Sequence, residues 1–216
     1  MLNFIKHLTS KLRFCKSGAS LFSTALMVTS VGLVVGAATP LVKIYDQQQK
    51  MAVSAENNNQ ISTALREYID IHGRLPCPAP LDADMDTADF GKEISAGSGC
   101  NDASVTHAGI MTREGRDGET VQIGAVPVRT LGISDHTLVD GWGNRFIYAV
   151  SGHFTTGSPD FTKDNGAINL LDSNDNHVTS APGNVIYIVL SMGSRDVSSI
   201  NINGYETAAC EKVNAG

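Results

Sequence analysis

The chain has 216 residues, of which 42% are hydrophobic and 18% charged, with 21 Gly and 7 Pro. This is the composition of an ordinary globular protein, and it excludes a disordered or collagen-like chain. The formal net charge is −6, and an acidic chain with one Trp and no basic stripe argues against nucleic acid as a partner.

The N-terminal region has the charge pattern of a membrane-anchored protein. Lys6, Lys11, Arg13 and Lys16 are followed by 26 residues, 17–42, without an ionisable side chain. A membrane-spanning helix needs ~20 apolar residues, so this stretch is long enough to cross a bilayer once. Because basic residues precede it and acidic residues follow it, we expect the N-terminus in the cytoplasm and the main body outside it.

The same stretch contains features of helices that pack closely in lipid. Gly32 and Gly36 have the Gly-x-x-x-Gly spacing that allows a neighbouring helix to approach. Pro40 is expected to kink the helix rather than end it. We therefore predict that Gly32, Gly36 and Pro40 take part in helix packing.

Beyond Lys43 the pattern predicts that the helix continues as an amphipathic segment. Its apolar stripe begins at Ile44 and Met51, is interrupted by a polar run at 57–60, and resumes with Ile61, Leu65 and Tyr68. Gly73 followed by Pro76 is a helix stop signal, because Gly takes the left-handed cap conformation and Pro cannot continue the hydrogen-bond ladder. The apolar face is expected to form the core with the rest of the chain.

After Cys77 the sequence changes to short apolar runs separated by turn dipeptides. Residues 145–150 and 185–190 are rich in β-branched and aromatic side chains, as strands are, and 167–171 is a third candidate strand. Residues 43–216 are therefore predicted to form one α+β domain. The turn signals are Asp117-Gly118, Asp140-Gly141, Asn165-Gly166 and Asn203-Gly204.

The cysteines predict one disulfide. Cys15 lies before the apolar stretch, whereas Cys77, Cys100 and Cys210 follow it, on the side where disulfides persist. We favour a bridge between Cys77 and Cys100, which closes a short loop, over one between Cys77 and Cys210. Sequence alone does not decide the connectivity.

An acidic segment after Cys77 has the spacing of calcium ligands. Asp82, Asp84, Asp86 and Glu93 occupy the first, third, fifth and twelfth places of a Ca²⁺ loop of the EF-hand type. The sixth place, which needs Gly, holds Thr87, and the prolines before the segment forbid a preceding helix. Calcium is the one cofactor that the sequence suggests, and a solvated acidic loop is the competing interpretation.

Catalytic motifs are missing from the sequence. It contains no Gly-x-Ser-x-Gly, His-Glu-x-x-His or Cys-x-x-Cys pattern and no phosphate-binding loop. Since the four histidines after Cys77 are scattered without partners at metal-ligand spacing, we predict that the chain is not an enzyme. These histidines are His107, His136, His153 and His177.

Several stretches together resemble a known family. Lys16-Ser17-Gly18 before the apolar run is similar to a prepilin peptidase site, with cleavage between Gly18 and Ala19. Pro40 would then be residue 22 of the mature chain, where pilins have a proline. The run 140–148 (Asp-Gly-Trp-Gly-Asn-Arg-Phe-Ile-Tyr) resembles the Asp-Pro-Trp-Gly-Asn-Pro-Tyr-x-Tyr stretch of major pseudopilins, through Asp140, Trp142, Gly143 and Asn144. The run 191–196 (Ser-Met-Gly-Ser-Arg-Asp) resembles their late Ser-x-Gly-x-Asp-Gly turn.

On these motifs the chain resembles type IV pilin-like proteins, and most closely a pseudopilin of a type II secretion system. The resemblance implies a prepilin leader at 1–18, the transmembrane half of a long helix at 19–42, and a periplasmic head at 43–216, in which the outer half of the helix packs on a small antiparallel sheet. The family usually has Phe and Glu where this chain has Ala19 and Ser23. Ser23 cannot supply the family's intramembrane carboxylate, which favours a minor or specialised subunit.

The resemblance also implies a function and partners. A single-pass precursor in the inner membrane would be cleaved and methylated, and would join other pilin-like subunits in a periplasmic pseudopilus or pilus for protein secretion. Its partners would be prepilin peptidase, the inner-membrane assembly platform and those subunits. The alternative is a soluble or anchored periplasmic binding protein with a conventional signal-peptidase site at Gly36-Ala37-Ala38. A membrane-anchored hydrolase using the histidines is a third hypothesis.

Overall fold

The computed structural model describes residues 21–94, 99–100, 109–162, 166–179 and 185–194; within 21–41 it describes only the backbone, together with the Thr29 side chain. The chain divides into two compact units, Met1–Asp46 and Gln47–Gly216. The predicted cleavage residues Gly18 and Ala19, and also Cys210, lie outside the described residues.

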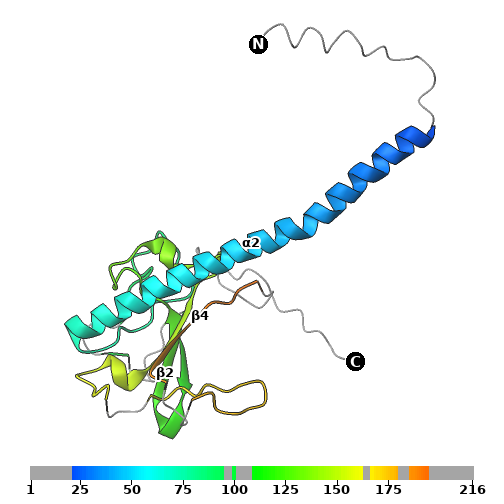
Figure 1. Ribbon diagram of the computed structural model, residues 1–216. Coiled ribbons are helices and arrows are strands. Elements are labelled where there is room, and N and C mark those ends of the chain that lie inside the picture. Colours follow the sequence, from blue (N-terminus) through cyan, green and yellow to red (C-terminus); the bar gives the residue numbers. More distant parts are fainter. Residues whose placement is uncertain (1–20, 95–98, 101–108, 163–165, 180–184, 195–216) are drawn as a thin grey trace. The chain divides into compact units, whose positions relative to one another are not determined.

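Helix α2 runs from Leu21 to His72 and is the blue-to-cyan ribbon of Figure 1. It continues through Pro40 and ends as predicted at Gly73, whose φ of +66° is left-handed and whose N–H donates to Ile69 O at 2.7 Å. Among the described residues, no helix combines the length and apolarity of a membrane span. The predicted membrane segment includes Gly32 and Gly36. Almost none of its side chains are described, so it stays a prediction.

The second unit contains a four-stranded antiparallel sheet in the order β1-β2-β3-β4. The register pairs Thr112 with Gln122, Ile123 with Ala149, and Ala149 with Ile188. Asp117 and Gly118, in the turn between β1 and β2, both have positive φ, as the turn signal predicts. The strands are β1 (Met111–Glu114), β2 (Thr120–Ala125), β3 (Ile147–Ser151) and β4 (Tyr187–Leu190), and the 3-10 helices are η1 (Arg116–Gly118), η2 (Asp135–Leu138) and η3 (Gly152–Thr155).

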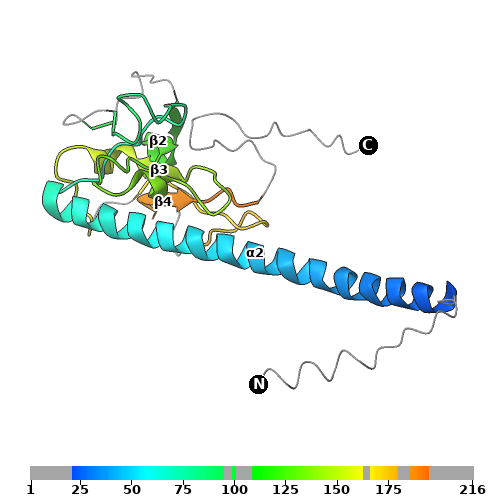
Figure 2. The same ribbon diagram turned by 90° about the horizontal axis from the view of Figure 1, so that it is seen from above.

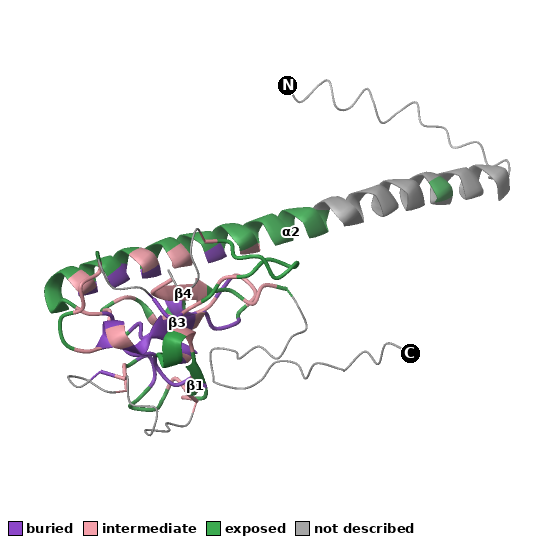
Figure 3. Ribbon diagram, turned by 90° about the horizontal axis from the view of Figure 1, so that it is seen from below, coloured by how far each residue is buried: buried purple, intermediate pink, exposed green. Residues whose placement is uncertain are grey.

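The C-terminal part of α2 lies across one face of this sheet in both Figure 1 and Figure 2. Ile61 and Leu65 are fully buried in one cluster with Tyr148 and Val150, because helix positions three, four and seven apart share a face. A smaller cluster contains Ala149 and Ala167, since successive strand residues face opposite sides. Figure 3 shows the same division, with purple turns on the sheet side of α2 and green on its outer side.

The comparison with the predicted elements confirms the α+β class and corrects two details. β3 and β4 lie within or next to the predicted strands 145–150 and 185–190. Residues 167–171 do not form a strand, because Ile168 and Leu171 make only isolated bridges. The first part of the predicted apolar stripe is not core either, since Ile44 and Met51 are about half exposed.

Candidate functional site

The carboxylate of Asp140 joins two loops that are far apart in the sequence. Its Oδ1 accepts hydrogen bonds from the N–H groups of Trp142 and Asn144, both at 2.9 Å. Its Oδ2 accepts from the Ser191 hydroxyl at 2.6 Å and from the Gly193 N–H at 3.2 Å. Asp140 is buried, and a buried carboxylate with all its partners satisfied holds both loops in one arrangement.

This loop also contacts helix α2. The Gly141 N–H donates to Ser54 Oγ at 2.9 Å, and that hydroxyl donates to Lys50 O at 2.8 Å. Asn57 Nδ2 donates to Val139 O at 2.7 Å. Since a Cβ at Gly141 would overlap Lys50 O, only glycine lets the loop approach the helix this closely. Residues 139–144, 191–193 and 50–57 therefore form one polar junction, named here the Asp140 junction.

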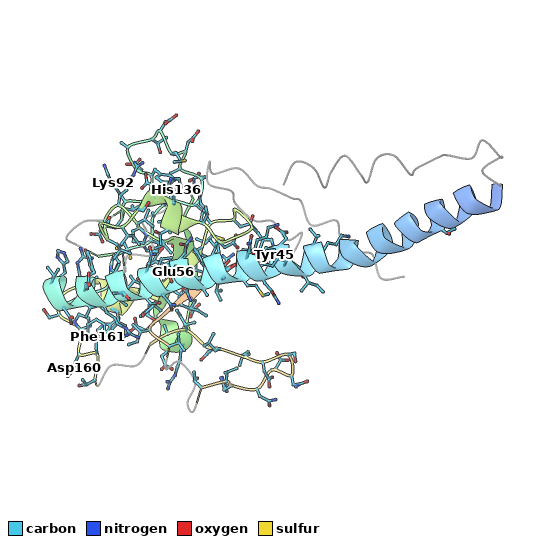
Figure 4. The ribbon with its side chains drawn as sticks, turned by 45° about the horizontal axis from the view of Figure 1, so that its top comes forward. Tyr45, Glu56, Lys92, His136, Asp160 and Phe161 are labelled. Atoms are coloured by element: carbon cyan, nitrogen blue, oxygen red, sulfur yellow. The ribbon has the colours of Figure 1, made fainter. Side chains whose placement is uncertain are left out.

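The polar run 57–60, which interrupts the apolar stripe in the sequence, belongs to this contact. Besides the Asn57 bond, Gln60 Oε1 accepts from the Thr137 hydroxyl at 3.3 Å. Figure 4 shows neighbouring Glu56 on the helix. Thus α2 packs through apolar side chains near its end and through hydrogen bonds one to two turns earlier.

A second polar cluster surrounds Glu93 near the C-terminal end of α2. Arg74 donates to both Glu93 oxygens at 3.0 Å, and the Cys77 N–H and the Tyr68 hydroxyl add one bond each, also at 3.0 Å. Burial alone would raise the pKa of Glu93, but the bonds from Arg74 and the Cys77 N–H outweigh it and lower this pKa. Burial and the neighbouring Glu93 raise the pKa of Tyr68 to about 12.

These contacts bear on the predicted calcium ligands. Both Glu93 oxygens accept hydrogen bonds from Arg74, so this carboxylate would have to give up that ion pair to serve as the twelfth ligand. Asp82, Asp84 and Asp89 line an open groove of about 690 Å³ together with Lys92. No group of three or more His, Cys, Asp or Glu side chains is arranged to hold a metal ion in the described part of the chain. Calcium binding through Asp82, Asp84, Asp86 and Glu93 stays a prediction.

Arg145 positions the acidic loop. Its guanidinium is buried over the Phe90 ring, 5.1 Å from the centroid, and donates to the carbonyls of Leu81 (2.6 Å) and Ala83 (2.5 Å). Burial lowers the pKa of Arg145 to about 10, while Asp84 and Asp82 act in the opposite direction. The carbonyls of this segment thus face Arg145, and Asp82 and Asp84 of the same segment line the groove.

Cys77 and Cys100 lie near each other as thiols, and the predicted disulfide between them stays a prediction. Their sulfurs are hydrogen-bond partners. The Cys100 N–H donates to Thr155 Oγ1 at 3.1 Å, on η3. The pair therefore joins the segment that follows α2 to the segment that precedes β1, and Cys100 also contacts η3.

The remaining predicted residues are not brought into either cluster. His136 and His153 lie on the separate short helices η2 and η3, and His153 packs edge-on against Phe154. His177 forms an isolated β-bridge with Leu171, and His107 lies outside the described residues. Trp142 is half-buried and Gly143 is exposed.

Sequence reasoning missed the partners of both clusters and the partner of Cys100. Ser54, Asn57, Arg74 and Thr155 stand in contexts where polar residues are normally solvated. The one usable signal was Ser54, which lies seven residues before Ile61 on the buried face of α2.

Comparison with known proteins does not assign the chain to a family, because no family model, curated protein or solved structure matches it.

Proposed function

We propose that this chain is a minor pilin-like subunit of the pseudopilin type, processed by prepilin peptidase and assembled into a periplasmic pseudopilus or pilus for protein secretion. The proposal takes residues 1–18 as a leader and 19–42 as a helix segment in the inner membrane. Its partners are other pilin-like subunits, the peptidase and an inner-membrane assembly platform. The role of the chain in the filament is to contribute surfaces.

The observation that supports the proposal most is the Asp140 junction. Two stretches resemble pseudopilins, and they lie about fifty residues apart in the sequence. Asp140 of the first stretch accepts hydrogen bonds from Ser191 and Gly193 of the second. A chance resemblance in two unrelated loops gives no reason for these particular residues to bond. A shared structural role explains both the residues and their contact.

The long helix is the second support. Helix α2 has 52 residues, far more than the ~11–12 of an average helix. Its last turns pack on the sheet, whereas the side chains of residues 42–49 are all exposed. A helix that packs on the sheet only through its last turns suits a subunit that assembles through other residues of that helix.

The decisive experiment is N-terminal sequencing of the protein purified from its own cells. The proposal expects a start at Ala19 with a methylated amino group. A start at Thr39 would identify a conventional signal peptide, and a start at Met1 an unprocessed anchor. Either of those results contradicts the proposed processing.

A matched pair of variants identifies the peptidase. Gly18→Val blocks the small-residue site before Ala19 and should leave a precursor that migrates as the full chain. Ala38→Phe blocks the alternative signal-peptidase site and should leave processing unchanged. The opposite pattern would support the exported binding protein instead.

A further inference from the structure

We propose that Cys77 and Cys100 form a redox-active pair that a disulfide oxidant closes into a bridge, with Cys100 as the attacking thiol and Cys77 as the resolving one. The bridge would link the segment that follows α2 to the segment that precedes β1, where Cys100 contacts η3. This inference is independent of the proposed filament function, because it concerns only the head.

The two thiols are held in place by separate parts of the structure. The Cys77 N–H donates to Glu93 Oε2 at 3.0 Å, and the Cys100 N–H donates to Thr155 Oγ1 at 3.1 Å. Thr155 is itself fixed by its hydroxyl bond to Gly152 O at 2.7 Å. The backbones of both cysteines are thus set before any covalent bond forms.

The preceding residues restrict both cysteines further. Leu75 N–H donates to Phe154 O at 2.8 Å, which ties the segment before Cys77 to η3. Gly99 has a φ of +74°, and a Cβ there would overlap Thr156. This glycine lets the Cys100 segment lie directly against η3. Both cysteine segments are therefore held against the same short helix, η3, which favours the close approach that a disulfide requires.

The two thiols differ in a way that orders the reaction. Cys77 is fully buried, whereas Cys100 is half-buried and is the one that an oxidant can reach. Hydrogen bonding between the two sulfurs lowers the pKa of Cys100 and, with burial, raises that of Cys77. Attack by a thiolate on a disulfide sulfur is the first step of exchange.

The chemistry balances with an oxidant of the disulfide class, R–S–S–R. The Cys100 thiolate attacks one oxidant sulfur, forms a mixed disulfide and releases the first R–S⁻, which takes up a proton. Cys77 then loses its proton and attacks the Cys100 sulfur, which releases the second R–S⁻ for protonation. Overall two thiols and one R–S–S–R give one internal disulfide and two R–SH, with two electrons passing to the oxidant.

The test uses the reduced full-length protein and glutathione disulfide as the oxidant. Peptide mass mapping after quenching free thiols with a maleimide should find Cys77 linked to Cys100, with Cys15 and Cys210 not in that bridge. Cys210→Ser is the matched control and should give the same bridge. A Cys77–Cys210 link, or maleimide on both Cys77 and Cys100, would overturn the proposal.

The order of attack has its own readout. Cys77→Ser should accumulate a glutathione adduct on Cys100, and Cys100→Ser should form the adduct on Cys77 at least tenfold more slowly. An early quench of the wild-type reaction provides the same information without a variant at the buried Cys77. A mixed disulfide that appears first on Cys77 would refute the assigned order.

Discussion

Replacing Asp140 with Asn tests the hydrogen bonds at the centre of the Asp140 junction. The new Oδ1 can still accept from Trp142 and Asn144, but the new amide would point a donor at the Gly193 N–H. A buried donor left without an acceptor costs about 1–3 kcal/mol. We expect Asp140→Asn to lower the free energy of unfolding by that amount, measured by chemical denaturation. Asp86→Asn, at an exposed carboxylate of the acidic loop, is the control and should change little.

Two glycines of the same loop allow the effects of steric crowding and of backbone strain to be tested separately. Gly143 has a φ of +84° and open space around it, so Gly143→Ala should cost about 1–2 kcal/mol, the price of a left-handed side chain. At Gly141 a Cβ would overlap the Lys50 backbone, so Gly141→Ala should push the loop away from α2. Hydrogen exchange should show faster exchange around residues 50–57 in Gly141→Ala alone. Equal exchange in both variants would contradict this explanation.

The Glu93 cluster predicts a pH dependence of stability. The pKa of Glu93 is lower in the folded protein than its ordinary value of 4.5, because Arg74 and the Cys77 N–H stabilise the carboxylate. A group with a lowered folded-state pKa contributes stability above its unfolded pKa and loses it as the pH falls through the folded pKa. The Tm of the wild type should therefore fall more steeply below about pH 4.5 than that of Glu93→Gln. Glu67→Gln, an exposed site on α2, should keep the wild-type slope.

At the scale of elements, α2 is the one whose core contribution can be measured most directly. Leu65 is fully buried against the sheet, while Met51 on the same helix is 53% exposed. Leu65→Ala should cost about 2–5 kcal/mol, because it removes buried methyl groups and leaves a cavity. Met51→Ala should change stability by less than about 0.5 kcal/mol. A similar loss in both variants would mean that Met51 is covered in solution.

The sequence predicted α2 well because its end has an unambiguous signal, the glycine that caps it at residue 73. It did not predict β1 and β2. β1 is polar and mostly exposed, with the sequence Met-Thr-Arg-Glu. β2 contains Gly124, where a Cβ would lie 2.5 Å from Ala79 O. Tertiary contacts form these two strands, so strand propensity is a weak guide to them.

The candidate site was predictable only in its parts. Asp140 and Ser191 stand out separately in the sequence, but their contact depends on the sheet register. Ile147, at the start of β3, pairs with Leu190, at the end of β4. The residues that precede β3 and those that follow β4 therefore lie at the same end of this strand pair. Nothing in the local sequence predicts this pairing. The local sequence likewise does not predict that Cys100 lies beside Cys77.

For the whole molecule, the exposed part of α2 gives the sharpest test of the proposed assembly. Val42, Ile44 and Tyr45 are apolar, and each is more than half exposed; Tyr45 is labelled on the helix in Figure 4. A row of exposed apolar side chains on one helix is unfavourable in water and is typical of a surface that another protein covers. If the chain is a pilin-like subunit, neighbouring subunits should cover it.

A photo-crosslinking amino acid at position 45, in the cells that make the protein, tests this expectation. We expect a crosslink to another pilin-like subunit, and its loss in Gly18→Val, which retains the leader and should not assemble. The control places the same amino acid at Asp86, an exposed head residue in the acidic loop, where we expect a different crosslinking pattern. The same crosslinks at position 45 in the unprocessed variant would show that this surface binds its partner without assembly. That result would contradict a role of the exposed part of α2 in forming the filament.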